Sequence, residues 1–309
     1  MTTNQSKLIR NEKIAAAILE PKQSSKPLIT VITPTYNRGE MVQTTIKSVI
    51  NQTFENWELI VIDDGSTDNT EAAVQQFLND SRISYYKKPN TGQADSLNLG
   101  TRYASGDYIT FLDSDDEAYP NWLEVVSRNI KEDTNVVTVA AMRKLLNGEI
   151  VYENIDNFRF SGDTVRLKIT CGSLFLRRHI FNDIGGYDPE MKSNIQTDLA
   201  YRLLTYLKKT NGKIVPVDEH LVQINIHSGP RIRTDWTKRR EGTKQFLQKN
   251  YNYILENSPQ DIASAYSIIA FSSYKLKDRR ESLRYLFKVI KLKPFVFINY
   301  LKFFRYAFL

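Results

Sequence analysis

The chain of 309 residues is long enough for one large domain, or for one domain with a small appendix, and its 41% hydrophobic content is that of an ordinary globular protein. Its single cysteine, Cys171, excludes an internal disulfide framework and fits a reducing compartment. An apolar run at residues 14–19 is too short for a signal-peptide core or a membrane span. We therefore expect the folded body of the protein in the cytoplasm.

The end of the chain is basic. A net charge of +7 is compatible with a nucleic-acid binder, a membrane-facing surface or a phosphate-handling surface. After Glu281 there is no acidic residue, and basic residues alternate with Leu, Phe, Tyr and Ile. These basic residues are Arg284, Lys288, Lys291, Lys293, Lys302 and Arg305. The pattern is more typical of a segment that faces anionic lipid, so we expect no nucleic-acid partner.

The first half of the chain predicts alternating strands and helices after a polar extension at residues 1–26. Continuous apolar, β-branched runs predict buried strands, and apolar residues at helical spacing predict the helices between them. The strands are expected at 28–33, 57–63, 82–88 and 108–113, with helices at 41–50, from Ser66 or Thr67 onward, and at 93–104. This alternation is typical of an α/β fold with a mostly parallel doubly wound sheet. Ligands of such sheets bind beyond the carboxyl ends of the strands.

The second half changes character. Runs at 136–146 and 149–154 flank Asn147-Gly148, which predicts a hairpin and a second sheet region beside the parallel half. Further elements are expected as a helix at 121–131, a strand at 172–177, a helix at 198–208 and a strand at 214–226. From Trp236 onward the pattern is helical only. We expect a main domain at 27–235, divided at residue 123, and a helical C-terminal region at 236–309.

Three carboxylates follow the strand at 108–113 within four positions: Asp113, Asp115 and Asp116. Neighbouring carboxylates raise one another's pKa unless a cation or hydrogen-bond donors absorb the charge. Mg²⁺ is a hard cation that needs one or two protein carboxylates and keeps positions for substrate phosphates. The alternative is a solvated acidic turn, against which the apolar strand before it argues. The sequence therefore predicts a metal-assisted phosphate-ester site.

Two other loops fall on the same predicted edge. PTYNR at 34–38 follows a strand, where a nucleobase or phosphate would bind, although Pro and Asn also form ordinary turns. Asp63 ends a buried strand and can accept a hydrogen bond from an imide or a ribose hydroxyl. Asp64 has the alternative of a turn residue. The segment 90–100 lacks the spacing and the lysine of a P-loop.

Together PTYNR, IDDGSTD, NTGQADSLNLG and FLDSDD resemble the nucleotide-sugar-binding half of the family-2 inverting glycosyltransferases, over about residues 28–123. The resemblance implies a nucleotide-diphospho-sugar transferase fold of the A type, a donor such as a UDP-sugar, and Mg²⁺ or Mn²⁺. By matching position, Asp63 would contact the base, Asp113 the ribose or sugar, and Asp115 the metal, with Asp116 as a second candidate ligand. The residues expected to line the donor pocket are Pro34, Tyr36, Arg38, Asp63, Asp64, Asn90, Gln93 and Asp113.

The acceptor half matches less closely. TDLAYRL at 197–203 lies where the family has Glu-Asp before a helix, and Thr197 replaces the Glu. Asp198 alone fits the catalytic base, and its alternative role is a helix N-cap. His227 matches a histidine that helps to hold the metal or diphosphate; its alternative is a polar residue near the surface. Arg231 and Arg233 are expected to neutralise the diphosphate.

The resemblance therefore predicts an inverting transfer of sugar from a nucleotide-sugar donor to a glycan or lipid-linked acceptor, as in cell-surface polysaccharide or glycolipid synthesis. A metal-dependent nucleotidyltransferase would share the pocket but would carry a basic, glycine-rich loop, which PTYNR is not. A non-catalytic basic membrane-surface binder is the third alternative. The segment 295–309 is too short to span a bilayer, and it either packs on the body or makes a peripheral membrane contact.

Overall fold

The computed structural model describes residues 27–160, 162–229 and 235–308. The helices are α2 (Gly39–Ile50), α3 (Thr70–Gln75), α4 (Gln93–Tyr103), α5 (Trp122–Asn129), α6 (Arg178–Asp183), α7 (Ile195–Thr210), α8 (Trp236–Asn257), α9 (Pro259–Lys275), α10 (Arg279–Leu292) and α11 (Phe297–Phe308). The strands are β1 (Ile29–Thr35), β2 (Trp57–Asp63), β3 (Ile83–Lys87), β4 (Tyr108–Phe111), β5 (Glu117–Ala118), β6 (Thr134–Lys144), β7 (Ile150–Glu153), β8 (Asp156–Phe160), β9 (Asp163–Leu167), β10 (Leu174–Arg177) and β11 (Lys213–Asn225).

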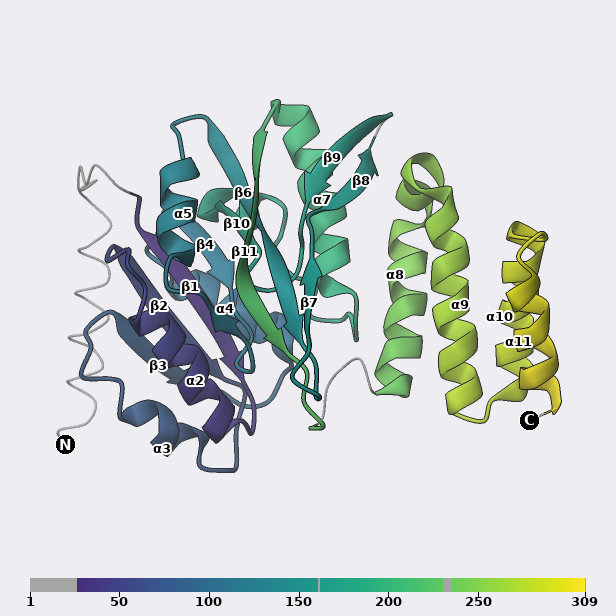
Figure 1. The fold of residues 1–309 in the computed structure, drawn as a ribbon, viewed down its shortest axis with the longest axis horizontal. Helices are drawn as coiled ribbons and strands as arrows, with labels where there is room; N and C mark the ends of the chain where they lie inside the picture. The colour runs from purple at the N-terminus through teal and green to yellow at the C-terminus, as the bar shows by residue number, and fades with distance from the viewer. Residues whose placement is uncertain (1–26, 161, 230–234, 309) are drawn as a thin grey trace.

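A nine-stranded sheet runs through the main body in the order β3-β2-β1-β4-β10-β6-β11-β5, with β7 paired to β6 (Figure 1). The strands from β3 to β4 are mutually parallel, as the alternating pattern predicts. β10 is antiparallel to both β4 and β6, while β11 is parallel to β6. The α/β class with a helical C-terminal extension is confirmed.

Several details differ from the sequence-based expectation. α7 begins at Ile195 with Asn194 as its N-cap, so Asp198 lies inside the helix and the N-cap alternative for it is wrong. The hairpin at Asn147-Gly148 forms between β6 and β7, but these strands extend the main sheet and do not build a second one. A separate two-stranded sheet, β8–β9, was not predicted. α3 begins at Thr70, because Ser66 accepts a hydrogen bond from the Asn37 amide instead of capping a helix.

Two apolar cores lie on opposite faces of the sheet. Successive side chains of a strand point to opposite faces, so Leu59 and Val61 of β2 join one core while Ile60 and Ile62 join the other. Helices α2, α3 and α5 contribute to the first core. Helices α4, α6 and α7 contribute to the second. Both faces are therefore covered, and the polar side chains gather where the strands end.

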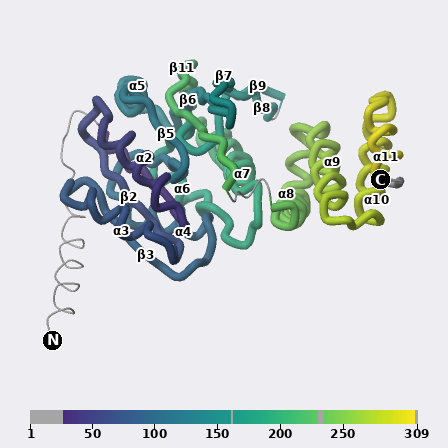
Figure 2. The backbone as a smooth tube through the Cα atoms, turned by 60° about the horizontal axis from the view of Figure 1, so that its bottom comes forward, coloured from purple at the N-terminus to yellow at the C-terminus, as the bar shows by residue number. Residues whose placement is uncertain are grey.

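The C-terminal helices stand beside the sheet (Figures 1 and 2). Phe246 and Ile254 of α8 and Ile269 of α9 belong to the same core as α7. A smaller core around Ala270, Leu286 and Val289, with Tyr306, joins α9, α10 and α11. The predicted boundary at residue 235 therefore stays a prediction. Within the described residues, none of the helices combines the length and apolar character needed to cross a bilayer.

Candidate functional site

The carboxyl ends of the parallel strands meet at one edge of the sheet. Thr35 at the end of β1 pairs with Asp63 at the end of β2, and Ile32 of β1 pairs with Phe111 of β4. The loop that carries Asp113 thus leaves the sheet next to the loops that follow Thr35 and Asp63. The expectation that these segments share an edge is confirmed by this register.

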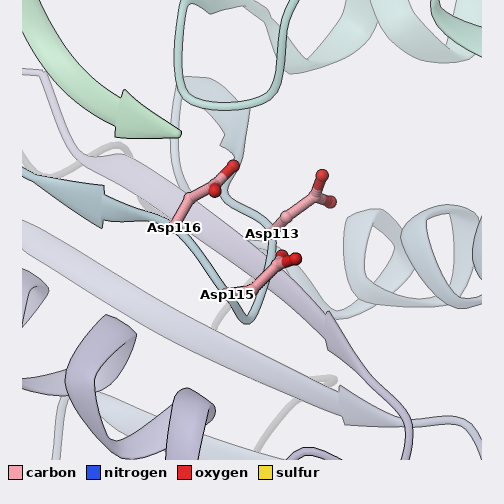
Figure 3. Close-up of side chains that lie close together, drawn as sticks. All are labelled: Asp113, Asp115 and Asp116. Carbon is pink, nitrogen blue, oxygen red and sulfur yellow. The ribbon is translucent and has the colours of Figure 1, made fainter. Parts of the chain in front are cut away.

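The three carboxylates after β4 form a compact cluster. Candidate ligand oxygens of Asp113, Asp115 and Asp116 lie within 4.8 Å of one another (Figure 3). Asp115 is 8% exposed and Asp116 is 3% exposed. Burial of charged carboxylates is costly unless a cation or donors compensate it, and carboxylate oxygens are the ligands that Mg²⁺ and Mn²⁺ prefer. The donor set therefore fits a hard divalent cation.

Asp115 contacts two basic side chains. The Nη1 atom of Arg38 lies 2.7 Å from Oδ1, and Nε2 of His227 lies 2.8 Å from Oδ2. The Gly229 amide donates to Nδ1 of His227 at 3.1 Å, so a neutral imidazole carries its proton on Nε2 and donates it to Asp115. In this arrangement His227 orients the Asp115 carboxylate and donates a hydrogen bond to it. Its predicted role as a metal ligand stays a prediction.

Asp116 and Asp113 have different partners. The backbone amide of Asn225, at the end of β11, donates to Oδ1 of Asp116 at 3.0 Å, and Thr45 of α2 donates to its carbonyl at 2.7 Å. These bonds anchor the loop between two elements distant in sequence. Nε2 of Gln93, the first residue of α4, donates to Oδ1 of Asp113 at 2.9 Å. The structure thus brings two predicted donor-pocket residues, Gln93 and Asp113, into direct contact.

Asp63 is fully buried and already bound within the protein. Its Oδ1 accepts from the Ser66 amide at 2.7 Å, and its Oδ2 accepts from the Tyr85 hydroxyl at 2.5 Å. Burial and the hydrogen bond to Asp63 raise the pKa of Tyr85, which keeps that hydroxyl protonated as a donor. A nucleobase that donates to Asp63 would have to share a carboxylate oxygen with the Ser66 amide or the Tyr85 hydroxyl.

Asp64 holds the neighbouring loop. Its carboxylate pairs with Lys88 and accepts from the amides of Thr91 and Gly92, both at 2.9 Å. Gly92 has φ +101°, a backbone conformation that residues other than glycine rarely adopt. These contacts support the turn-residue alternative for Asp64: it shapes the loop that leads to Gln93.

The remaining predicted donor residues differ in exposure. Pro34 is buried within β1. Tyr36 is 46% exposed and Asn90 is exposed, so both side chains are free to meet a ligand at this edge. Asn37, which follows Tyr36, has φ 50° and accepts from the Thr67 amide at 2.8 Å, which ties PTYNR to the loop after β2. Arg231 and Arg233 lie outside the described residues.

Asp198 on α7 is 0% exposed and faces α8. Its Oδ2 accepts from Nη2 of Arg202 at 2.7 Å and from Nζ of Lys249 at 3.2 Å, while its Oδ1 accepts from Nδ2 of Asn250 at 3.0 Å. Lys249 also donates to Asp188 at 2.7 Å, and this bond lowers the pKa of Asp188. The carboxylate therefore links two helices. Its role as general base stays a prediction.

Cys171 and Gln196 are site neighbours that the sequence analysis did not select. Nε2 of Gln196, two residues before Asp198, lies 3.7 Å from Sγ of Cys171. Burial and the charges of Asp113 and Asp116 raise the pKa of the Cys171 thiol well above its usual value. The thiol therefore lies beside the carboxylate cluster as a neutral group. No local motif marks this residue, because the contact joins separate parts of the chain.

Comparisons with known proteins agree with this geometry. Residues 30–184 match the family model for glycosyl transferase family 2. An uncharacterized glycosyltransferase of Rickettsia bellii is 38% identical over 135 residues, which are 44% of this chain and 20% of that protein, so the chain spans only about a fifth of this relative.

A second relative and one solved structure extend the comparison. WfgD of Escherichia coli, named as a UDP-Glc:α-D-GlcNAc-diphosphoundecaprenol β-1,3-glucosyltransferase, is 44% identical over 99 residues, which are 32% of this chain and 39% of that protein. TarS of S. aureus, crystallised with UDP-GlcNAc, is 19% identical with a TM-score of 0.62, and the likeness covers 91% of this chain and 89% of that one. The A-type fold is thus confirmed, and the chain belongs to glycosyl transferase family 2.

Proposed function

We propose that the protein is an inverting glycosyltransferase that moves a sugar from a nucleotide-diphospho-sugar, a UDP-sugar above all, to a hydroxyl of a glycan or lipid-linked acceptor. The observation that carries the proposal is the cluster of Asp113, Asp115 and Asp116 at the carboxyl edge of the sheet in a family-2 chain. The UDP-sugar named for WfgD and the UDP-GlcNAc bound by TarS support this donor class. Cell-surface polysaccharide or glycolipid synthesis in the cytoplasm is the setting that fits such an acceptor.

The carboxylates would hold Mn²⁺ or Mg²⁺, with Asp115 as the first ligand and Asp116 as a second. Such an ion, when bound, supplies a Lewis acid for the diphosphate that leaves. Before an ion binds, Arg38 and His227 hold the Asp115 carboxylate in place by contacting both of its oxygens. Gln93 fixes the Asp113 carboxylate, which can then accept a hydrogen bond from a ribose or sugar hydroxyl.

The acceptor hydroxyl must lose its proton as it attacks the anomeric carbon, and a carboxylate general base accelerates such a step by ~10²–10⁴-fold. Asp198 is the base that the family resemblance implies. Arg202 and Lys249 donate to Oδ2 of Asp198, and Asn250 donates to Oδ1. Because this carboxylate is also 0% exposed, Asp198 can take the proton only after a rearrangement that gives the acceptor hydroxyl access to it. Attack opposite the leaving group gives inversion at the anomeric carbon.

The test is incubation of the purified chain with a panel of nucleotide sugars and Mn²⁺, followed by analysis of the released nucleotide. A glycosyltransferase releases a nucleoside diphosphate from the nucleotide sugar as the sugar passes to an acceptor hydroxyl or, more slowly, to water. A nucleotidyltransferase releases pyrophosphate in a parallel reaction that supplies a nucleoside triphosphate and a sugar 1-phosphate. A non-catalytic binder releases neither product. Thermal shift with the same panel selects the donor, since a ligand that binds only the native state raises its melting temperature. Pyrophosphate release, or no release with any donor that binds, would reject the proposed activity.

A further inference from the structure

The last helix, α11, turns its apolar side away from the protein. Phe297, Leu301 and Phe304 are 72%, 49% and 61% exposed, while Asn299 and Tyr306 are 6% and 5% exposed. Residues at positions i, i+4 and i+7 share one face of a helix, so the three exposed side chains form a single stripe. A surface helix of a globular protein normally shows the reverse arrangement. Something other than water is expected to cover this face.

The apolar stripe continues onto the preceding turn and onto α10. Of the seventeen large hydrophobic residues that are exposed in the described chain, nine lie between positions 287 and 304. We call these nine residues the terminal apolar face. They are Phe287, Leu292, Phe295, Val296, Phe297, Ile298, Tyr300, Leu301 and Phe304. Phe295 is 98% exposed, so its ring has almost no contact within the chain. Exposed apolar surface of this density marks an interaction site.

The charges around the terminal apolar face identify its partner. All six charged residues after Glu281 are basic. Nζ of Lys291 lies 4.8 Å from the ring centroid of Phe287, and Arg305 is exposed beside Phe304 in the sequence. Aromatic and aliphatic side chains mixed with Lys and Arg are typical of helices that lie in the interface of anionic lipid. A second copy of this chain would bring the same positive charge against it.

We propose that the terminal apolar face binds the surface of an anionic lipid bilayer. The aromatic and aliphatic side chains of α11 and of the turn at 293–296 enter the headgroup region, and Lys291, Lys293 and Arg305 contact the lipid phosphates. The opposite side of α11 stays packed, because Tyr306 stacks on Tyr274 of α9 at 4.3 Å between ring centroids. Both alternatives for the C-terminal segment thus hold at once: one side of the helix packs on the body, and the other binds the membrane.

Binding to lipid is separate from the proposed sugar transfer and is tested without any activity measurement. The intact chain is mixed with vesicles of phosphatidylcholine, with or without phosphatidylglycerol, and floated on a density gradient. We expect flotation with the anionic vesicles, and weaker flotation at high salt because salt screens the contact of lysine and arginine with the lipid phosphates. No flotation with anionic vesicles would overturn the proposal.

Two matched variants locate the contact. Phe297→Glu/Leu301→Glu/Phe304→Glu places three charges on the terminal apolar face, and we expect at least about a tenfold loss of the vesicle-bound fraction. Leu146→Glu/Tyr251→Glu/Leu255→Glu adds the same charge at exposed apolar positions elsewhere and should float like the intact chain. If the two variants float to the same extent, whether like the intact chain or less than it, α11 is not the contact and the assignment of the lipid contact to the terminal apolar face is rejected.

Folding and self-association are checked on the same samples. Circular dichroism and thermal melting must show that the α11 variant is as folded as the control, and three single Glu substitutions replace the triple variant if it is not. Size-exclusion chromatography with light scattering measures the oligomeric state. A dimer that the α11 variant alone converts to a monomer, together with no flotation of the intact chain, would assign the face to a second copy and overturn the lipid proposal.

Discussion

The guanidinium of Arg38 lies 2.7 Å from Oδ1 of Asp115, a carboxylate that is also a candidate metal ligand. His227 contacts the other oxygen at 2.8 Å. Protein side chains therefore compensate this buried charge when no ligand is bound. A divalent cation at Asp115 would compete with both, so metal binding and these two contacts are expected to be coupled.

Asp115→Asn is expected to remove the response to metal. A ligand at 100 times its dissociation constant stabilises the native state by about 2.7 kcal/mol, and the neutral amide of the variant would lack the charge that binds Mn²⁺. The melting temperature with Mn²⁺ should then equal that with chelator, and nucleoside diphosphate release should fall at least about 100-fold. The control is Glu124→Gln on an exposed α5 pair. A full Mn²⁺ shift in the Asp115 variant would exclude Asp115 as a ligand.

Arg38→Ala is expected to destabilise the metal-free protein by about 2 kcal/mol, because Asp115 loses a charged hydrogen bond at a buried position. Mn²⁺ should reduce this loss, since the cation supplies the missing positive charge. The melting temperatures of the unchanged chain and of the Arg38 variant are each measured with and without Mn²⁺. Arg128→Ala, which breaks a mostly exposed pair, should change little. If Mn²⁺ leaves the destabilisation by Arg38→Ala unchanged, metal binding and the contact between Arg38 and Asp115 are not coupled.

Asp198→Asn tests two roles at once. As general base, Asp198 accounts for ~10²–10⁴-fold in turnover, so kcat of the folded variant should collapse while donor binding persists. As a link between α7 and α8, its loss should also lower the melting temperature, as should Lys249→Met. Lys249→Met keeps the carboxylate and should keep measurable turnover. Normal kcat in folded Asp198→Asn would leave only the linking role.

Cys171 should resist thiol reagents in the native protein. Burial and the neighbouring charges of Asp113 and Asp116 raise the pKa of its thiol, so the reactive thiolate is scarce at pH 8. Ellman's reagent should leave the native chain unmodified for as long as it stays folded and should label one thiol per chain in denaturant. Rapid labelling without denaturant would show that the thiol is accessible. The labelling rate of the native chain is compared with and without Mn²⁺ or a nucleotide-sugar donor.

Local sequence patterns were sufficient for the four parallel strands β1 to β4 and for the shared edge of the sheet. The predicted strand 57–63 matches β2 residue for residue, because the continuous apolar run at 59–62, which contains three β-branched residues, is typical of a buried strand. The proximity of Asp63 and Asp113 follows from parallel neighbours that end at one edge. The family-2 motifs then gave the fold and the family.

Contacts between distant segments were out of reach. The four residues of β10 contain no signal for their antiparallel place between β4 and β6. Arg202 lies one helical turn after Asp198, so the sequence could have indicated that contact. Lys249 and Asn250 lie about fifty positions after Asp198, so nothing near Asp198 indicates their contacts with its oxygens. Likewise, Arg38 was expected at the donor, and its pairing with Asp115 depends on loops that only the fold brings together.

The shared core of α7, α8 and α9 has a consequence for the acceptor. Because Phe246, Leu247 and Ile269 pack with Leu203 of α7, the helical end of the chain is fastened to the sheet by side-chain packing. If the terminal apolar face binds a bilayer as proposed, this packing would hold the carboxylate cluster at a fixed height above the lipid. A lipid-linked acceptor would then reach the site only if its terminal sugar extends to that height. The packing of α7, α8 and α9 would thus select acceptors by their length.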